Sequence, residues 1–445
     1  MNQPTLSTQT HPKALYLLFF TEMWERFSYY GMRALLVLFL VSEVSKGGLG
    51  WSSAQAGQLY GLYTGLVYVT PLLGGYLADK FLGFRYAVMI GAFLMALGHG
   101  SLAFESIFAF YLGLLLLVIG NGFFKPNISS MVGQLYPDGS PLKDSGYTVF
   151  YMGINIGAFL GILVCGYLGE KVGWHYGFGA ASVGMSFGLV LFYSLQNMLG
   201  DVGLQPIKVK NKVVATEIQP LTQDEKERLY ALLILAFFSI VFWLAFEQAG
   251  SSMNVFALKY TERQLMWIGF EIPASWFQTL NPFFIFILAP FVSMLWIKLD
   301  NIDKNPNGPL KFALGLFLLG LGFLVLVIGA ANIPKGAESA SVSMMWLILA
   351  ILLHTMGELC ISPVGLSFVN KLSPKHLMGI MFGMWFLAVA VGNYVGGVLY
   401  GMIDDIVKTQ SISTFFLMFV GIAMGAAVVL FVLSFGLRKR MHGVE

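Results

Sequence analysis

Long apolar runs alternate with short polar segments over nearly the whole chain. Twelve runs can be placed, each of about 20 or more residues and so long enough to cross the hydrocarbon core of a bilayer as a helix. They cover residues 14–42, 53–79, 84–103, 107–135, 145–169, 175–198, 228–259, 273–299, 310–331, 341–370, 376–402 and 411–436. The pattern predicts an all-α membrane protein with 12 transmembrane helices in two six-helix bundles, 1–198 and 228–445, joined by a polar linker at 199–227.

Composition and charge agree with this prediction. The chain is 57% hydrophobic and 11% charged, with a mean hydropathy of +0.74, which excludes an ordinary soluble protein. Of the 26 Lys and Arg residues, 17 fall on the side of the two termini, six on the other side and three within helices. Basic residues favour the cytoplasmic side, so both termini and the linker are predicted to be cytoplasmic, in a multi-pass protein of the cell membrane.

Four charged residues lie inside the first apolar run: Glu22, Glu25, Arg26 and Arg33. On a helix they share an arc of about 100° with Tyr29. Each charge costs roughly 2.5–3.5 kcal/mol at the centre of a bilayer, so membrane helices usually keep such groups for function. The arc is predicted to face a bundle interior or a watery cavity, although an ion-pair ladder with a purely structural role is the alternative.

Three more ionisable residues lie within predicted helices: Lys125, next to Pro126, and the acids Glu247 and Glu358 of the second half. The embedded set therefore holds four acids and three bases, which leaves one acid without a matching base. A buried acid whose cation moves between partners can take up and release a proton near neutral pH. Each of the three could also be structural.

Polar and aromatic residues complete the candidate set. Asn155 and Asn281 could bind a solute or could simply join helices by hydrogen bonds. The aromatic candidates are weaker because most such residues pack or lie at the membrane interface. They are Tyr30, Tyr68, Trp243 and Trp385.

The sequence favours neither a metal site nor an enzyme. His99 and His354 are predicted to be hydrogen-bonded core or interfacial residues, without metal-ligand spacing. No HExxH or GxGD motif occurs, and no nucleophile elbow is predicted, because the GxSxG spacing at 184–188 falls inside the apolar run 175–198; an intramembrane enzyme is therefore not indicated. There is also no basic patch for nucleic acid. The partners indicated are the lipid bilayer and a small solute, and the oligomeric state is left open.

Three motifs identify the chain as similar to the proton-dependent oligopeptide transporter family of the major facilitator superfamily. They are Glu-x-x-Glu-Arg-Phe-x-Tyr-Tyr-Gly at 22–31, Phe-Phe-Lys-Pro-Asn at 123–127 and Phe-Tyr-x-x-Ile-Asn-x-Gly at 150–157. Trp-Phe-Gln-x-Leu-Asn-Pro at 276–282 extends the likeness, and residues 74–85 resemble the loop between helices two and three of that superfamily. The resemblance implies a major facilitator fold and proton symport of di- and tripeptides, with protons as the coupling ion and no cofactor.

The resemblance also implies roles for matching residues. Proton coupling falls to Glu22, Glu25, Arg26 and Glu247. Arg26 and Lys125 would attract the peptide carboxylate, and Glu358, helped by the two asparagines, would meet the amino terminus. Arg33–Glu247 and Lys125–Glu358 would be gate salt bridges. The substrate-binding set is Arg26, Tyr30, Arg33, Tyr68, Lys125, Asn155, Trp243, Asn281, Glu358 and Trp385.

Two departures and one alternative qualify the resemblance. The segment 199–227 is too short and too polar for the two additional helices of many bacterial members, and no histidine occurs within 53–79. Proton coupling would then rest on carboxylates, with Glu22 and Glu247 favoured. The alternative is a related proton-coupled transporter of another small solute, such as nitrate or amino acids; the retained glutamates argue against an anion.

Overall fold

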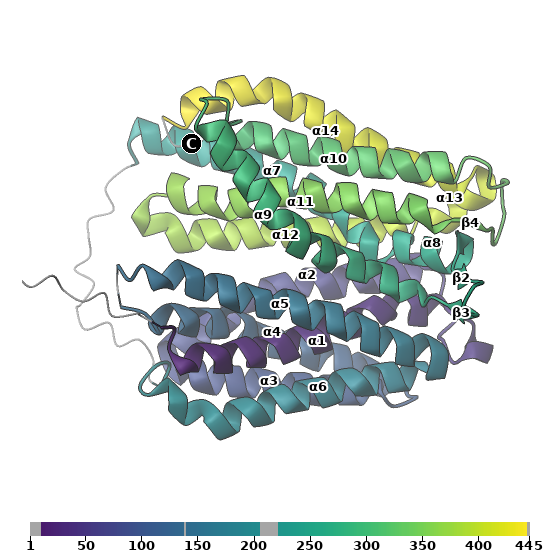
Figure 1. Cartoon of the computed structure of the whole chain (residues 1–445), viewed down its shortest axis with the longest axis horizontal. Helices are drawn as coiled ribbons and strands as arrows, with labels where there is room; N and C mark the ends of the chain where they lie inside the picture. Colours follow the sequence, from purple (N-terminus) through teal and green to yellow (C-terminus); the bar gives the residue numbers. More distant parts are fainter. Residues whose placement is uncertain (1–9, 138, 205–220, 443–445) are drawn as a thin grey trace, which may run out of the picture. The chain divides into compact units, whose positions relative to one another are not determined.

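The computed structural model describes residues 10–137, 139–204 and 221–442, and these residues are largely helical (Figure 1). Contacts divide the chain into two compact units. Unit 1 comprises Met1–Met32 and Thr70–Lys212, and unit 2 comprises Arg33–Val69 and Val213–Glu445. Helices α1 and α2 each contribute to both units.

The helices of the first half are α1 (Lys13–Val41), η1 (Val44–Lys46), α2 (Ser53–Leu77), η2 (Ala78–Leu82), α3 (Phe84–Leu102), α4 (Ile107–Gln134), α5 (Leu142–Tyr167), η3 (Leu168–Val172), α6 (Trp174–Leu195) and η4 (Gln196–Leu199). The second half contains α7 (Gln223–Phe246), η5 (Glu247–Gly250), α8 (Ser252–Tyr260), β1 (Thr261–Glu262), β2 (Gln264–Leu265), β3 (Phe270–Glu271), η6 (Ala274–Thr279), α9 (Leu280–Asp300), α10 (Gly308–Gly329), β4 (Val342–Ser343), α11 (Met344–Leu372), η7 (Lys375–Leu377), α12 (Met378–Tyr400), α13 (Ile403–Thr409) and α14 (Ile412–Arg440).

Every predicted apolar run coincides with one helix or with two or three consecutive helical segments, so the predicted all-α membrane fold is confirmed. Within the described ranges, nine helical segments are long and apolar enough to span a membrane. Helices α1, α2 and α3 are not among these nine segments. Helix α1 is left out because its apolar stretch contains the charged residues within 22–33. The division into two six-helix bundles remains a prediction, and much of the predicted linker, 205–220, lies outside the described residues.

Unit 1 is held together by close helix packing at glycines. Helix α3 packs against α4 and α6. A side chain at Gly98 of α3 would lie 2.9 Å from the carbonyl oxygen of Gly113 on α4, so only glycine allows this approach. Glycines at 157 and 161 of α5 likewise lie directly against backbone carbonyls of α1. This contact fixes the α1 segment that carries the first charges.

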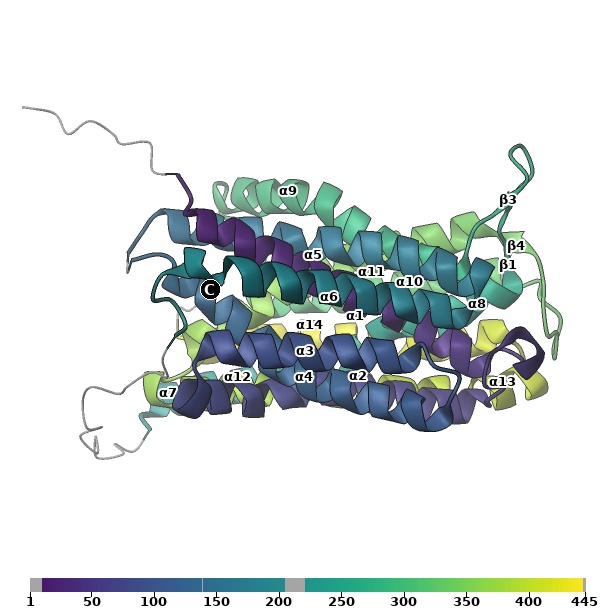
Figure 2. The same ribbon diagram turned by 90° about the horizontal axis from the view of Figure 1, so that it is seen from below.

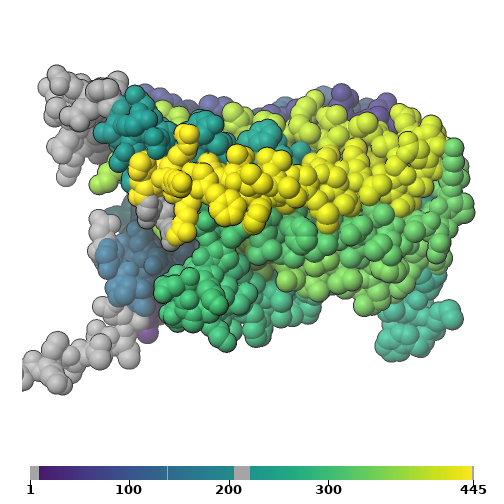
Figure 3. Space-filling model, turned by 90° about the horizontal axis from the view of Figure 1, so that it is seen from above, coloured from purple at the N-terminus to yellow at the C-terminus, as the bar shows by residue number. Residues whose placement is uncertain are grey.

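In unit 2, α10 packs against α11 and α14, and α7 packs against α12. Figure 3 shows α14, in yellow, along one face of the molecule. Two short sheets lie at the helix ends, which the sequence pattern did not predict. β1 pairs in parallel with β4, and β2 pairs with β3 in an antiparallel hairpin.

Candidate functional site

The first buried charge centre is formed by one turn of α1 in unit 1. Glu22, Glu25 and Arg26 are all buried. Arg26 Nε lies 2.9 Å from Glu22 Oε1 and also forms an ion pair with Glu25. Its guanidinium lies 5.5 Å from the ring centroid of Tyr29, one turn further along the helix. Positions three and four apart share a helix face, so the local sequence alone brings these charges together.

Lys125 of α4 is the second cation of this centre. It acts electrostatically on both Glu22 and Glu25, and it is half-buried. Pro126 lies inside α4 and removes one helical hydrogen bond next to it. The first centre of unit 1 therefore contains two acids and two bases, and its formal charge is balanced when all four are ionised.

The second buried charge centre is built around Arg33, seven residues after Arg26 in the sequence of α1. It belongs to unit 2 and consists of Arg33, Tyr60 of α2 and Glu247 of η5. Arg33 Nη2 forms an ion pair with Glu247 Oε2. Arg33 Nε donates to Tyr60 Oη at 3.0 Å, and Tyr60 Oη donates to Glu247 Oε2 at 3.2 Å. The phenol thus joins both members of the ion pair, and its side chain is fully buried.

Glu247 lies at a break in the helix that the sequence predicted as one run, 228–259. Helix α7 ends at Phe246, and a short 3-10 turn precedes α8. Gln248 satisfies part of the disturbed backbone by donating to the carbonyl oxygen of Leu244 at 3.2 Å, and it joins this turn to α12 by donating to the carbonyl oxygen of Gly396 at 2.9 Å. Irregular backbone within a membrane helix requires such internal partners. At this break the Glu247 carboxylate contacts Arg33 and Tyr60.

The α1 backbone beside Arg33 is also held by side chains of unit 2. Asn254 of α8 donates to the carbonyl oxygen of Ala34 at 2.8 Å, and Gln278 of η6 donates to the same oxygen at 3.4 Å. These bonds fix the position of α1 at the residue next to the cation. The second centre is therefore constrained through backbone as well as side chains.

Glu358 of α11 forms a third polar group, also in unit 2. Asn281 Nδ2 of α9 donates to Glu358 Oε2 at 2.8 Å and to Thr355 Oγ1 at 3.2 Å. Asn281 therefore does join two helices, as the structural alternative for it proposed. The amide is a neutral donor, so it lowers the cost of burying the carboxylate without compensating its charge.

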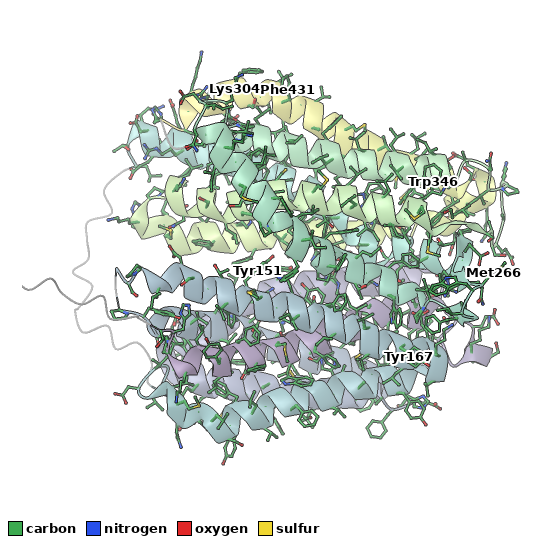
Figure 4. The ribbon with its side chains drawn as sticks, viewed as in Figure 1. Tyr151, Tyr167, Met266, Lys304, Trp346 and Phe431 are labelled. Carbon is green, nitrogen blue, oxygen red and sulfur yellow. The ribbon has the colours of Figure 1, made fainter. Side chains whose placement is uncertain are left out.

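The other candidate residues occupy separate places. Tyr30 packs edge-to-face on Tyr29 in unit 1, and Asn155 of α5 donates to the carbonyl oxygen of Tyr151 one turn earlier. In unit 2, Tyr68 is half-buried, Trp243 packs on Phe242 and Phe246, and Trp385 packs on Phe312. Figure 4 labels Tyr151 on α5. Lys125 and Glu358 belong to different units, and their predicted gate pair remains a prediction.

Sequence reasoning missed the tyrosine of the second centre. Tyr60 is one of 19 tyrosines, in a helix without charged residues, and nothing in its local pattern distinguishes it. Asn254 gave no signal either. His99 is buried in the core as predicted, but the prediction that it is hydrogen-bonded was wrong: neither ring nitrogen has a hydrogen-bond partner within the part of the chain that the structure describes. The same residues hold no cluster of three His, Cys, Asp or Glu side chains suited to a metal ion.

Comparison with known proteins gives consistent matches over nearly the full chain. Residues 85–218 and 202–418 match the model of the POT family. The peptide transporter YePEPT of Yersinia enterocolitica is 36% identical, with 88% of each chain covered. A di-/tripeptide transporter of Lactococcus lactis subsp. cremoris is 32% identical over 98% of this chain and 97% of its own. A crystal structure of a peptide transporter POT in complex with sulfate has a TM-score of 0.89 at 34% identity, covering 99% and 98% of the two chains.

The substitution Tyr60→Phe tests the second centre. It removes the hydroxyl that links Arg33 to Glu247 but keeps the ring. Since a hydrogen bond to a charged group contributes about 1.5–3 kcal/mol, we expect a loss of that order in the free energy of unfolding. The measurement is the melting temperature of the purified protein in detergent. Tyr193→Phe, at an exposed position of α6, is the matched control and should change little. Equal melting temperatures for the two variants would contradict the bridging role.

Proposed function

The chain belongs to the POT family, and from this we propose that it imports di- and tripeptides by symport with protons. The names of the relatives from Yersinia and Lactococcus support a peptide substrate. The observation that carries the proposal is the pair of buried charge centres on α1, which lies in a chain built from membrane helices. Groups so costly to bury are retained in transporters for substrate and proton pathways.

The charged residues divide according to the two ends of a peptide. Arg26 and Lys125 supply cations for the carboxylate of the substrate. Glu358 supplies the anion for the ammonium group of the peptide. Within unit 2 this carboxylate accepts a hydrogen bond from the neutral amide of Asn281, which does not compensate its charge. A peptide ammonium would compensate the negative charge of Glu358 through a charge-assisted hydrogen bond, which the neutral amide cannot do. Recognition of both termini explains why the residues between them could vary.

Glu22, Glu25, Arg26 and Glu247 are the proposed proton-coupling residues. In each centre a carboxylate shares its cation with another group: Glu22 with Glu25, and Glu247 with the Tyr60 hydroxyl. When a carboxylate is protonated, its attraction for the cation is lost and the arginine becomes available to another anion. Proton uptake and peptide binding would then favour each other. Arg33–Glu247 and Lys125–Glu358 are the proposed gate pairs.

The remaining predictions form part of the same proposal. Tyr30, Tyr68, Asn155, Trp243, Asn281 and Trp385 line the substrate site. The halves 1–198 and 228–445 alternate access across the membrane, with both termini and the linker in the cytoplasm. Protons serve as the coupling ion, without a metal, and no catalytic step is involved. The second candidate, a proton-coupled transporter of nitrate or amino acids, would not use both ends of a peptide.

Uptake into liposomes tests the proposal. An inward proton gradient should drive accumulation of labelled dialanine, unlabelled di- and tripeptides should compete, and free alanine should not. Glu22→Gln should abolish gradient-driven uptake, because the amide cannot take up a proton. It should leave exchange of labelled for unlabelled dialanine measurable, because exchange needs no net proton movement.

The matched control is Glu338→Gln, at an exposed loop position, which should retain driven uptake. Accumulation that a protonophore does not reduce would contradict symport. Full driven uptake by Glu22→Gln would show that this carboxylate is not the coupling site. Competition by free alanine as strong as that by dipeptides would favour the amino-acid alternative.

Glu358→Gln tests recognition of the peptide ammonium. The substitution keeps a side-chain amide oxygen for Asn281 but removes the negative charge. A charge-assisted hydrogen bond of about 1.5–3 kcal/mol corresponds to a roughly 10- to 150-fold increase in the KM for dialanine exchange. Glu338→Gln again provides the control. An unchanged KM would place the ammonium elsewhere.

A further inference from the structure

The hairpin formed by residues 263–272 carries an unusual apolar tip. Met266 is 90% exposed and Trp267 is 82% exposed, the highest values for large hydrophobic side chains in the described ranges. Ile268 is also exposed, and no charged residue lies between Gln264 and Phe270. Such a group would be unfavourable in water, because Met266 and Trp267 remain almost fully solvated and Ile268 about half so.

The base of the hairpin is polar and well fixed. Arg263 Nη2 lies 2.7 Å from Glu271 Oε1, and the Ile272 amide donates to the Arg263 carbonyl oxygen at 3.0 Å. The turn closes through the Ile268 amide, which donates to the carbonyl oxygen of Leu265 at 3.0 Å. Gly269 completes it with φ of +63°, a conformation that suits glycine. The tip is therefore held out by its own backbone and does not collapse onto the helices.

The hairpin projects from unit 2 on the side where the largely exposed helix α9 lies (Figure 2). It lies at the helix ends opposite the C-terminus (Figure 1), and Figure 2 shows it projecting sideways from the helix axes on the side where α9 lies. Figure 3 shows the same lateral projection, and Figure 4 labels Met266 there. The span 274–300, which contains α9, is only 11% buried in its most apolar stretch, with Phe283 and Phe286 exposed. From Arg263 to Trp267 the strand extends about 13 Å.

We propose that the 263–272 hairpin is an interfacial anchor whose tip inserts into the lipid leaflet opposite the termini. Tryptophan favours the membrane interface, because its ring is apolar and its indole N–H can bond to headgroups or water. Met266 and Ile268 add apolar area on either side of Trp267. The charged residues of the base, Arg263 and Glu271, remain at the headgroup level.

Lipid fits this surface better than water or a second copy of the chain. The hairpin follows directly into η6 and α9, so a bilayer that surrounds α9 would lie next to the hairpin. The tip itself is too small for a stable protein interface, which buries about 800 Å² on each partner. A narrow apolar tip on a polar base, projecting sideways from the helix ends (Figure 2), fits the interfacial layer of the lipid beside α9.

A fluorescent probe at Met266 tests the anchor without removing Trp267. The two native cysteines, Cys165 and Cys360, are buried and are replaced by alanine in the background chain. Met266→Cys is labelled with the polarity-sensitive dye NBD in the full-length protein, which is reconstituted in vesicles of phosphatidylethanolamine and phosphatidylglycerol. Glu338→Cys, in the exposed loop whose Ala340 amide bonds to the carbonyl oxygen of Lys259, is the matched control on the same side.

The anchor predicts that lipids with a doxyl group near the headgroup remove most of the NBD emission at residue 266, whereas iodide in the buffer removes little. The control site should respond in the opposite way. Adding Trp267→Ser should shift residue 266 towards the behaviour of the control. Quenching by iodide at both sites would overturn the proposal. It would also be overturned if doxyl lipid had no effect at residue 266 and protection from iodide rose with the protein density in the vesicles, because a second copy of the chain would then cover the tip.

Discussion

The cost of placing charge in a membrane constrains this structure more than any other interaction. An isolated ionised group in the bilayer interior is expensive, so each must be paired, hydrogen-bonded or neutralised by a proton. The chain satisfies that condition in two ways. In unit 1, one turn of α1 places Arg26 between Glu22 and Glu25, and Lys125 balances the charge. In unit 2, Arg33 is paired with Glu247 through an ion pair and a shared tyrosine hydroxyl.

Other features of the fold follow from these pairs. Glycines of α5 let α1 approach closely enough to bury the first centre. Helix α7 ends before Glu247, where a 3-10 turn begins. The side chain of Gln248 stabilises this irregular turn by two hydrogen bonds to backbone carbonyl oxygens. Glu358, in contrast to the acids of the two charge centres, has the neutral amide of Asn281 as its donor within unit 2. Local ion pairs and hydrogen bonds thus offset the cost of burying each charged group. Protonation or a charged substrate would change these interactions, so the groups that stabilise the fold can also take part in transport.

Much of the fold could be predicted from the sequence, because twelve apolar runs separated by polar segments leave few alternatives for a chain in a membrane. The charged residues of the site could be found for the same reason: charge in an apolar run is conspicuous. Tyr60 and Asn254 could not be found in this way. Nothing in the local sequence of a helical tyrosine or asparagine indicates a hydrogen-bond partner that lies 187 or 220 residues away. The break at Glu247 and the 263–272 hairpin depend on tertiary hydrogen bonds, which periodicity does not record.

Peptide and proton are proposed to move together because protonation of a buried carboxylate releases the cation that the peptide carboxylate then binds. The most direct measurement is the internal pH of vesicles that contain the purified protein and a trapped pH-sensitive dye, with no initial pH difference across the membrane and with the membrane potential clamped. Dialanine added outside should acidify the interior as it enters, and free alanine should not. Entry of labelled dialanine without any acidification would contradict the account.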